Sequence, residues 1–212
     1  VVDRSAWEKL LPYLRGYTTE EGENRILFED PVTSVEVPYT SLLTAAVIDG
    51  ILARYPFLKS GEIGKSVMGK PISYLEIGNG EKEVFYNASF HANESITTPV
   101  LLKFAEEYAQ AYEKGTALYG VPAAEYRLFL VPLVNPDGVD LVNGLLTDGG
   151  YYRRAQQIAS DYPAIPFPSG WKANIEGIDL NLQFPAGWEN AKRIKYAQGY
   201  TKPAPRDYVG EA

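Results

Sequence analysis

A histidine and a glutamate three positions apart are the residues of this sequence best suited to do chemistry together. His91 is the only histidine in the 212 residues, and Glu94 follows it in a His-x-x-Glu spacing. On a tight turn or on the first turn of a helix, side chains at positions i and i+3 point the same way. An imidazole nitrogen and a carboxylate oxygen that converge like this can bind one zinc ion. A pair of surface side chains would have the same spacing, so the spacing alone leaves both interpretations open.

The segments predicted around these two residues favour a metal site. A buried strand is predicted over residues 83–90 and an amphipathic helix over residues 98–112, and the polar loop with His91 and Glu94 lies between them. In sheets with parallel strands, binding sites gather at the carboxyl ends of the strands. A catalytic zinc needs three protein ligands and an open position for water, so this pair makes an incomplete site.

The order of the predicted elements from Thr40 onward indicates an α/β domain. A strand, a helix and another strand in succession favour a mostly parallel or mixed sheet, flanked by helices on both faces. Residues 144–175 are rich in glycine, proline and tyrosine, and we expect a long irregular loop there. The other predicted elements are a helix over 41–55, a hairpin of strands over 62–66 and 71–77, and a buried strand over 127–134.

Residues 1–37 differ from the rest of the chain. We interpret them as an N-terminal extension that packs on a domain formed by residues 38–212. Within the extension, a short helix is predicted over residues 7–14 with Ser5 as its N-cap. Residues 32–37, which lie between two prolines, are expected to be extended.

Composition excludes several classes of function. The net charge of −7 argues against a nucleic-acid partner, because phosphate binding needs a basic face. No apolar stretch approaches the length that spans a membrane. The absence of cysteine excludes disulfides, thiol catalysis and cysteine-bound zinc, and it is compatible with either the cytoplasm or the cell envelope. A serine hydrolase is excluded because no Gly-x-Ser-x-Gly motif occurs.

Three blocks of sequence resemble one known family. Residues 87–99 have the sequence Asn-Ala-Ser-Phe-His-Ala-Asn-Glu-Ser-Ile-Thr-Thr-Pro, which is similar to the metal-ligand segment of the zinc carboxypeptidase (carboxypeptidase A-like) family. Residues 131–139 resemble the family's next core strand and turn, and residues 177–185 resemble a substrate-binding strand. The blocks occur in the expected order within residues 38–190, and they look most like the bacterial γ-D-glutamyl-L-diamino acid endopeptidases.

The resemblance implies a role for each matching residue. His91 and Glu94 would bind zinc, and Asp179 would accept the hydrogen of the second ring nitrogen of His91 and so orient it. The substrate-binding residues that it implies are Asn174, Asn181 and Leu182.

The chain also departs from the family pattern. Leu182 stands where typical carboxypeptidases have an arginine that holds the terminal carboxylate of the substrate, and this argues against ordinary C-terminal trimming. Glu176 stands where an arginine that polarises the scissile carbonyl is expected. The family's third zinc ligand, a downstream histidine, and its general base, a glutamate further on, are not in this chain. We therefore assign no catalytic residue within these 212 residues.

The implied activity is zinc-dependent hydrolysis of a peptide or γ-D-glutamyl-diamino acid amide bond, in peptidoglycan stem peptides. This requires that the carboxyl-terminal half of the domain or a second copy of the chain completes the site. The alternative is a catalytically inactive relative that binds peptides or peptidoglycan.

Overall fold

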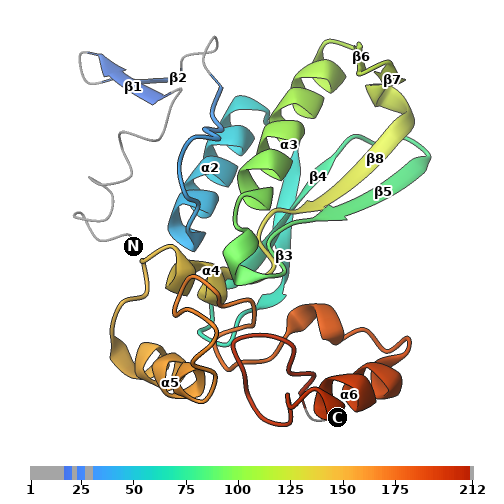
Figure 1. The fold of residues 1–212 in the computed structure, drawn as a ribbon. Coiled ribbons are helices and arrows are strands. Elements are labelled where there is room, and N and C mark those ends of the chain that lie inside the picture. The colour runs from blue at the N-terminus through green and yellow to red at the C-terminus, as the bar shows by residue number, and fades with distance from the viewer. Residues whose placement is uncertain (1–16, 21–22, 27–30, 211–212) are drawn as a thin grey trace.

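A mixed sheet with two long helices on one face forms the upper half of the molecule in Figure 1. The structure is a computed structural model, and it describes residues 17–20, 23–26 and 31–210. The helix predicted over residues 7–14 lies outside the described residues. The predicted α/β class with a mixed sheet and flanking helices is confirmed.

The four strands of the sheet are β3 (Lys59–Lys65), β4 (Pro71–Ile77), β5 (Lys82–Asn87) and β8 (Tyr126–Val131). Their order across the sheet is β3, β4, β8, β5. β3 and β4 form the predicted antiparallel hairpin, and β4 also pairs with β8 in antiparallel fashion. Parallel pairing in this sheet occurs between β5 and β8, the two strands that end beside the candidate site.

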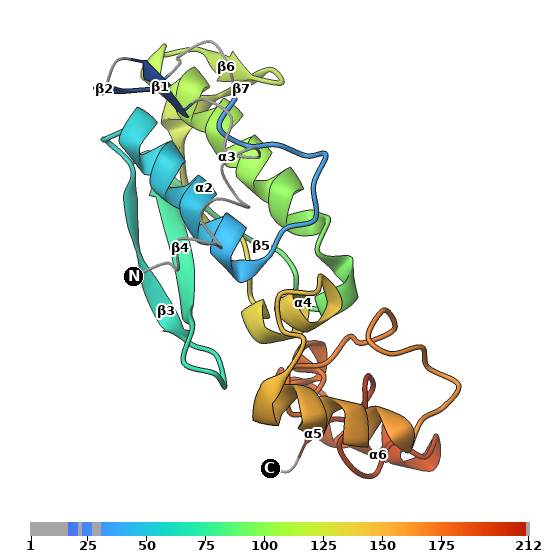
Figure 2. The same cartoon turned by 90° about the vertical axis from the view of Figure 1, so that its left-hand side faces the viewer.

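The helices α2 (Ser41–Arg54) and α3 (Thr97–Glu113) lie on the same face of the sheet, as the two views in Figures 1 and 2 show. Helices had been expected on both faces. Alternate residues of a strand point to opposite faces, so one face of β4 and β8 meets the helices. The core consists of buried side chains from these four elements, among them Val47, Ile51, Leu75, Ile77, Leu102, Ala105, Leu128 and Leu130.

The strand predicted over residues 83–90 is present as β5, but the prediction that it is buried is wrong. β5 is an edge strand, paired with β8 on one side. The side chains of Phe85 and Tyr86 are therefore 58% and 50% exposed. An apolar run favours a buried strand, but it carries no information on whether another strand pairs with its outer edge.

A buried carboxylate anchors the segment that precedes α2 to the helices α2 and α3. Glu106 of α3 accepts backbone hydrogen bonds from Val32 (2.7 Å) and Thr33 (3.0 Å). It also pairs with Arg54 of α2 at 3.0 Å, and both side chains are almost completely buried. Burying a carboxylate is costly unless it is paired and hydrogen-bonded, and Glu106 meets both conditions. Residues 32 and 33 are thereby held to both helices.

A second, smaller core lies in the lower half of Figure 1. It contains α4 (Pro136–Val142) and α5 (Gly149–Ser160), which pack around the buried Trp171. The expectation that residues 144–175 are irregular throughout is therefore wrong. α5 buries one side through Ala155, Ile158 and Ala159, which have helical spacing. The glycines at the start of α5 make this helical pattern hard to recognise in the sequence.

The remaining elements are short or lie at the surface. Within the described part of the chain, no helix combines the length and apolar character needed to cross a bilayer. The short and surface elements are β1 (Tyr17–Glu20), β2 (Glu23–Ile26), β6 (Ala117–Leu118), β7 (Val121–Pro122), the 3-10 turns η2 (Ala92–Glu94), η3 (Ala123–Glu125) and η4 (Leu180–Leu182), and α6 (Trp188–Ala197).

Candidate functional site

A turn with unusual backbone geometry leads from β5 to the candidate site. Ser89 has a φ of 51°, a left-handed conformation that residues other than glycine and asparagine rarely adopt. Its backbone N–H donates to Thr97 Oγ1 at 2.9 Å, and its hydroxyl lies 2.7 Å from that of Thr98. These bonds hold the strained residue in place and direct the chain out of the sheet, so that the next residues lie beyond the end of the strand.

The 3-10 turn η2 brings the two predicted metal ligands together. His91 Nδ1 lies 3.1 Å from Glu94 Oε2. Two ligand atoms at about 2.0–2.1 Å from a tetrahedral zinc are roughly 3.3 Å apart, so this separation fits a shared ion with little movement. Thr97 Oγ1 donates to the Glu94 carbonyl at 2.8 Å and fixes the turn that carries the carboxylate.

Asp179 faces the other nitrogen of the imidazole. His91 Nε2 lies 3.3 Å from Asp179 Oδ1, and the aspartate is buried. A carboxylate thus faces each ring nitrogen, and a proton on Nε2 would leave the Nδ1 lone pair for a metal. Asp179 also caps a turn, because its carboxylate accepts the backbone N–H groups of Asn181 (3.1 Å) and Asp207 (3.0 Å). The turn cap and the contact with the imidazole are thus compatible.

Replacing Asp179 with asparagine is expected to weaken zinc binding by about 10–100-fold, the range typical of lost outer-shell partners. The amide cannot accept from His91, Asn181 and Asp207 together, so the imidazole loses its fixed orientation. Zinc titration of the purified protein measures the effect. Asp161→Asn is the matched control, because that carboxylate lies in an exposed pair with Lys202. Equal zinc affinities for the two variants would contradict an orienting role for Asp179.

Asn135 connects the site loop to the rest of the fold, and sequence analysis did not single it out. Its side-chain N–H₂ donates to the carbonyls of Phe90 (3.2 Å) and Ala173 (2.9 Å), and its Oδ1 accepts the Gly138 N–H. A β-carbon at Gly138 would stand 2.8 Å from that of Ala92, so only glycine permits this close approach. The Asn-Pro-Asp-Gly turn in the sequence was the available signal.

Lys172 is a second residue that sequence analysis missed. Its ammonium lies 3.0 Å from Glu94 Oε1, the oxygen that does not face His91. Its carbonyl accepts the Ala92 N–H at 3.1 Å, so the lysine is fixed to the ligand loop through the backbone. Burial raises the pKa of the Glu94 carboxyl, but hydrogen bonds from Lys172 and His91 outweigh burial, and the net pKa lies below its usual value.

The predicted substrate-binding residues have different surroundings. Asn181 has an exposed side chain and stands two positions after Asp179, whose carboxylate lies beside the imidazole. Leu182 is half-buried in η4. Asn174 Oδ1 accepts the backbone N–H groups of Glu176 and Ile178, so this oxygen closes a local turn. Asn181 thus lies closer to Asp179 along the chain, whereas Asn174 shapes the segment that leads to Asp179.

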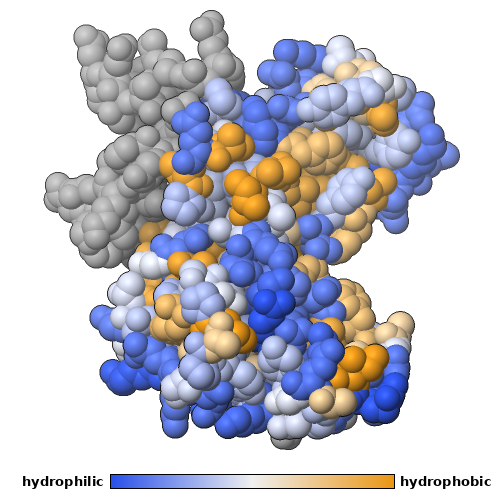
Figure 3. Space-filling model, viewed as in Figure 1, coloured by the Kyte–Doolittle hydropathy of each residue, from blue (hydrophilic) through white to orange (hydrophobic). Residues whose placement is uncertain are grey.

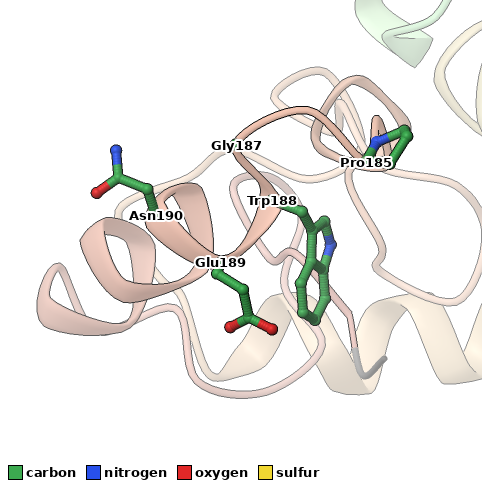
Figure 4. Close-up of a pocket in the computed structure, with 5 residues that line it drawn as sticks. All are labelled: Pro185, Gly187, Trp188, Glu189 and Asn190. Carbon is green, nitrogen blue, oxygen red and sulfur yellow. The ribbon is translucent and has the colours of Figure 1, made fainter.

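A surface hollow is lined by residues other than His91 and Glu94. It is found at the start of α6 (Figure 4), where the side chains of Trp188 and Glu189 extend to the same side of the helix. The Lys192 ammonium lies 4.6 Å from the centre of the Trp188 ring, so this ring already has a cation–π partner within the same helix. We therefore assign no ligand to it. The hollow is lined by Pro185, Gly187, Trp188, Glu189 and Asn190.

The described residues offer a pair of metal ligands and not a complete set. Over the ranges that the structure covers, no three histidine, aspartate or glutamate side chains are grouped so that they could share an ion. His91 and Glu94 fit zinc by donor type and separation.

The domain presents an imidazole and a carboxylate together beyond a strand of a mixed sheet, an arrangement that suits the binding of a divalent metal. The family model described as zinc carboxypeptidase matches residues 44–209. The chain belongs to the zinc carboxypeptidase family.

Two bacterial relatives are similar to this chain. One is γ-D-glutamyl-L-diamino acid endopeptidase 1 of Lysinibacillus sphaericus, 46% identical over 163 residues that cover 74% of this chain and 39% of the relative. The other is the uncharacterized protein YqgT of Bacillus subtilis (strain 168), 43% identical over 77% of this chain and 43% of the relative. The chain thus spans less than half the length of either relative.

Among solved structures, the crystal structure of thrombin activatable fibrinolysis inhibitor matches with a TM-score of 0.48 and 20% identity. The match covers 66% of this chain and 31% of that chain. Membership of the family rests on the sequence matches.

Proposed function

We propose that this chain supplies two of the three zinc ligands, His91 and Glu94, of a zinc-dependent peptidase. The observation that carries the proposal is the 3.1 Å approach of His91 Nδ1 to Glu94 Oε2, with Nε2 directed at Asp179. A zinc ion bound there would activate a water molecule and polarise the scissile carbonyl. His91 and Glu94 would hold the ion, and Asp179 would keep the imidazole in the tautomer that binds it.

The proposed substrate is an amide bond between a γ-linked D-glutamyl residue and a diamino acid, as found in peptidoglycan stem peptides. Support comes from the name of the Lysinibacillus sphaericus relative and its 46% identity over most of this chain. Leu182 also supports this substrate over an ordinary carboxypeptidase substrate, because an apolar side chain cannot pair with a terminal carboxylate.

The third zinc ligand and the general base are proposed to come from polypeptide outside these 212 residues. The free edge of β5 is where we expect that polypeptide to pair, because an unpaired strand edge is a template for another strand. A strand added parallel to β5 would end beside His91. Figure 3 shows apolar surface over α3 and the neighbouring strands, and exposed Phe85 and Val100 are part of the apolar surface of these elements. The carboxyl-terminal half of the domain is the proposed partner, and a second copy of the chain is the alternative.

The test supplies the carboxyl-terminal half of the Lysinibacillus sphaericus relative in trans. Once a complex is verified by size-exclusion chromatography, hydrolysis of a γ-D-glutamyl-diamino acid peptide is measured with and without zinc. We expect hydrolysis that requires zinc and is lost in His91→Ala.

An inactive binding relative is the second candidate, because Glu176 and Leu182 replace two expected arginines. A complex that binds the peptide and one zinc but does not hydrolyse the amide would favour this candidate. A chain that binds no zinc would exclude the peptidase.

A further inference from the structure

Asp207 and Tyr208 hold Asp179 through two backbone groups. The Asp179 carboxylate faces His91 Nε2 with Oδ1, and its Oδ2 accepts the backbone N–H of Asp207 at 3.0 Å. The backbone N–H of Asp179 donates to the Tyr208 carbonyl at 2.8 Å. Two neighbouring residues therefore fix both the backbone and the carboxylate of the residue that faces the imidazole.

The backbone at Asp207 has a left-handed conformation. Its φ is 69°, a region that aspartate, asparagine and glycine can enter but in which a β-branched residue is an outlier. The left-handed turn lies between the Asp207 N–H and the Tyr208 carbonyl, so it sets how these two groups are aimed at Asp179. A residue in such a conformation persists where its surroundings hold it in place.

Two cations hold the Asp207 side chain. Lys195 Nζ lies 2.6 Å from Asp207 Oδ1, and Arg206 Nε lies 2.9 Å from Oδ2. The Asp207 side chain is 19% exposed, so its attraction to these cations is screened less than that of a surface pair. Arg206 is the preceding residue, whereas Lys195 belongs to α6. The ion pair with Lys195 thus connects α6 to the segment that holds Asp179.

We propose that Asp207 is a positioning residue for the metal site and that Lys195 keeps it in place. The left-handed turn at Asp207 holds the Asp179 carboxylate against His91 Nε2. The imidazole then keeps the orientation in which Nδ1 reaches an ion shared with Glu94. Asp207 acts through Asp179, and Lys195 acts through Asp207. The inference rests on the proposed zinc site and extends that site to α6.

Substitutions that change the backbone preference at position 207 test the inference by zinc titration. Asp207→Val disfavours the left-handed conformation, whereas Asp207→Gly adopts it without steric cost. We expect Asp207→Val to weaken zinc binding about tenfold, the lower end of the range for outer-shell partners. Asp207→Gly keeps the turn and loses the ion pair. Its loss should be about threefold, the scale of one partly exposed pair, and Lys195→Met should lose the same.

Two controls carry the same changes away from the site. Tyr119→Val is the backbone control, because Tyr119 also has a left-handed φ, of 50°, at the turn between β6 and β7. Lys202→Met is the control for the ion pair, because Lys202 pairs with Asp161 at the surface. Both controls should bind zinc as tightly as the unmodified protein. Lys195→Met leaves Asp207 itself unchanged, so it tests the link even if Asp207→Val does not fold.

The proton on the imidazole distinguishes positioning from general stability. His91 is the only histidine of the chain, so its ring signals in the NMR spectrum of the zinc-loaded protein are identified at once. A proton on Nε2 that is bonded to Asp179 should exchange slowly with water. At saturating zinc, we expect faster exchange in Asp207→Val, slow exchange in Asp207→Gly, and no change in Tyr119→Val.

The outcomes separate this inference from the proposed function. Equal zinc affinities for Asp207→Val and Tyr119→Val, or equal losses in Asp207→Val and Asp207→Gly, overturn the role of the turn and leave the zinc site standing. Proton exchange that is unchanged in Asp207→Val identifies a purely structural role and also overturns the inference. An unchanged affinity in Lys195→Met overturns the part assigned to that lysine. No zinc binding by the unmodified protein overturns the proposed function and the inference together.

Discussion

Replacing His91 with alanine is expected to weaken zinc binding by at least about a hundredfold. Four-ligand structural zinc sites gain about 10–16 kcal/mol on binding, or roughly 3 kcal/mol per ligand, and this corresponds to about two orders of magnitude in affinity. His91 contributes the only imidazole that the chain contains, so no other histidine can substitute for it. Competition with a chromophoric chelator measures the affinity.

The carboxylate half of the pair gives a matched test. Glu94→Gln removes the charge and keeps the shape, and we expect a loss similar to that in His91→Ala. Glu125→Gln is the control, because Glu125 pairs with Lys82 at the surface and should leave zinc affinity unchanged. A zinc affinity that is equal in all three variants would show that the metal binds elsewhere.

Replacing Glu106 with glutamine is expected to lower the free energy of unfolding by about 3–5 kcal/mol, the range for breaking one side of a buried ion pair. The amide leaves the Arg54 charge buried without its carboxylate. Its N–H₂ group would also face one of the donors that Glu106 now satisfies, the N–H groups of Val32 and Thr33. Urea denaturation measures the loss.

The next residue on α3 provides the control for this substitution. The Glu107 carboxylate pairs with Lys103 at 3.6 Å and is partly exposed, so Glu107→Gln should stay within about 0.5 kcal/mol of the unmodified protein. Adding Arg54→Met to Glu106→Gln should restore part of the lost stability, because it removes the buried charge that has lost its carboxylate. If Glu106→Gln unfolds at the same urea concentration as Glu107→Gln, the buried pair does not anchor residues 32 and 33.

The features that sequence predicted well are local ones. The spacing of apolar residues predicted α2 and α3, and the two neighbouring strands over 62–66 and 71–77 were predicted as the hairpin of β3 and β4. The three-residue spacing of His91 and Glu94 predicted that their side chains face each other, and they do. Each of these depends on a short stretch of chain, where backbone geometry alone fixes which side chains meet.

The features that sequence missed depend on distant parts of the chain. Lys172 and Glu94 are 78 positions apart, and a backbone hydrogen bond from Ala92 of η2 to Lys172 brings their segments together. The exposure of Phe85 depends on what pairs with β5, which the strand's own composition does not encode. The left-handed turn at Ser89 is stabilised by threonine hydroxyls on α3, and serine alone does not predict it.

X-ray absorption at the zinc edge of the zinc-loaded protein tests most directly whether one imidazole and one carboxylate hold the same ion. We expect nitrogen and oxygen neighbours at about 2.0–2.1 Å with the outer-shell scattering of a single imidazole, which should vanish in His91→Ala. A spectrum without imidazole scattering, or one that His91→Ala leaves unchanged, would contradict the assignment of His91 as a zinc ligand.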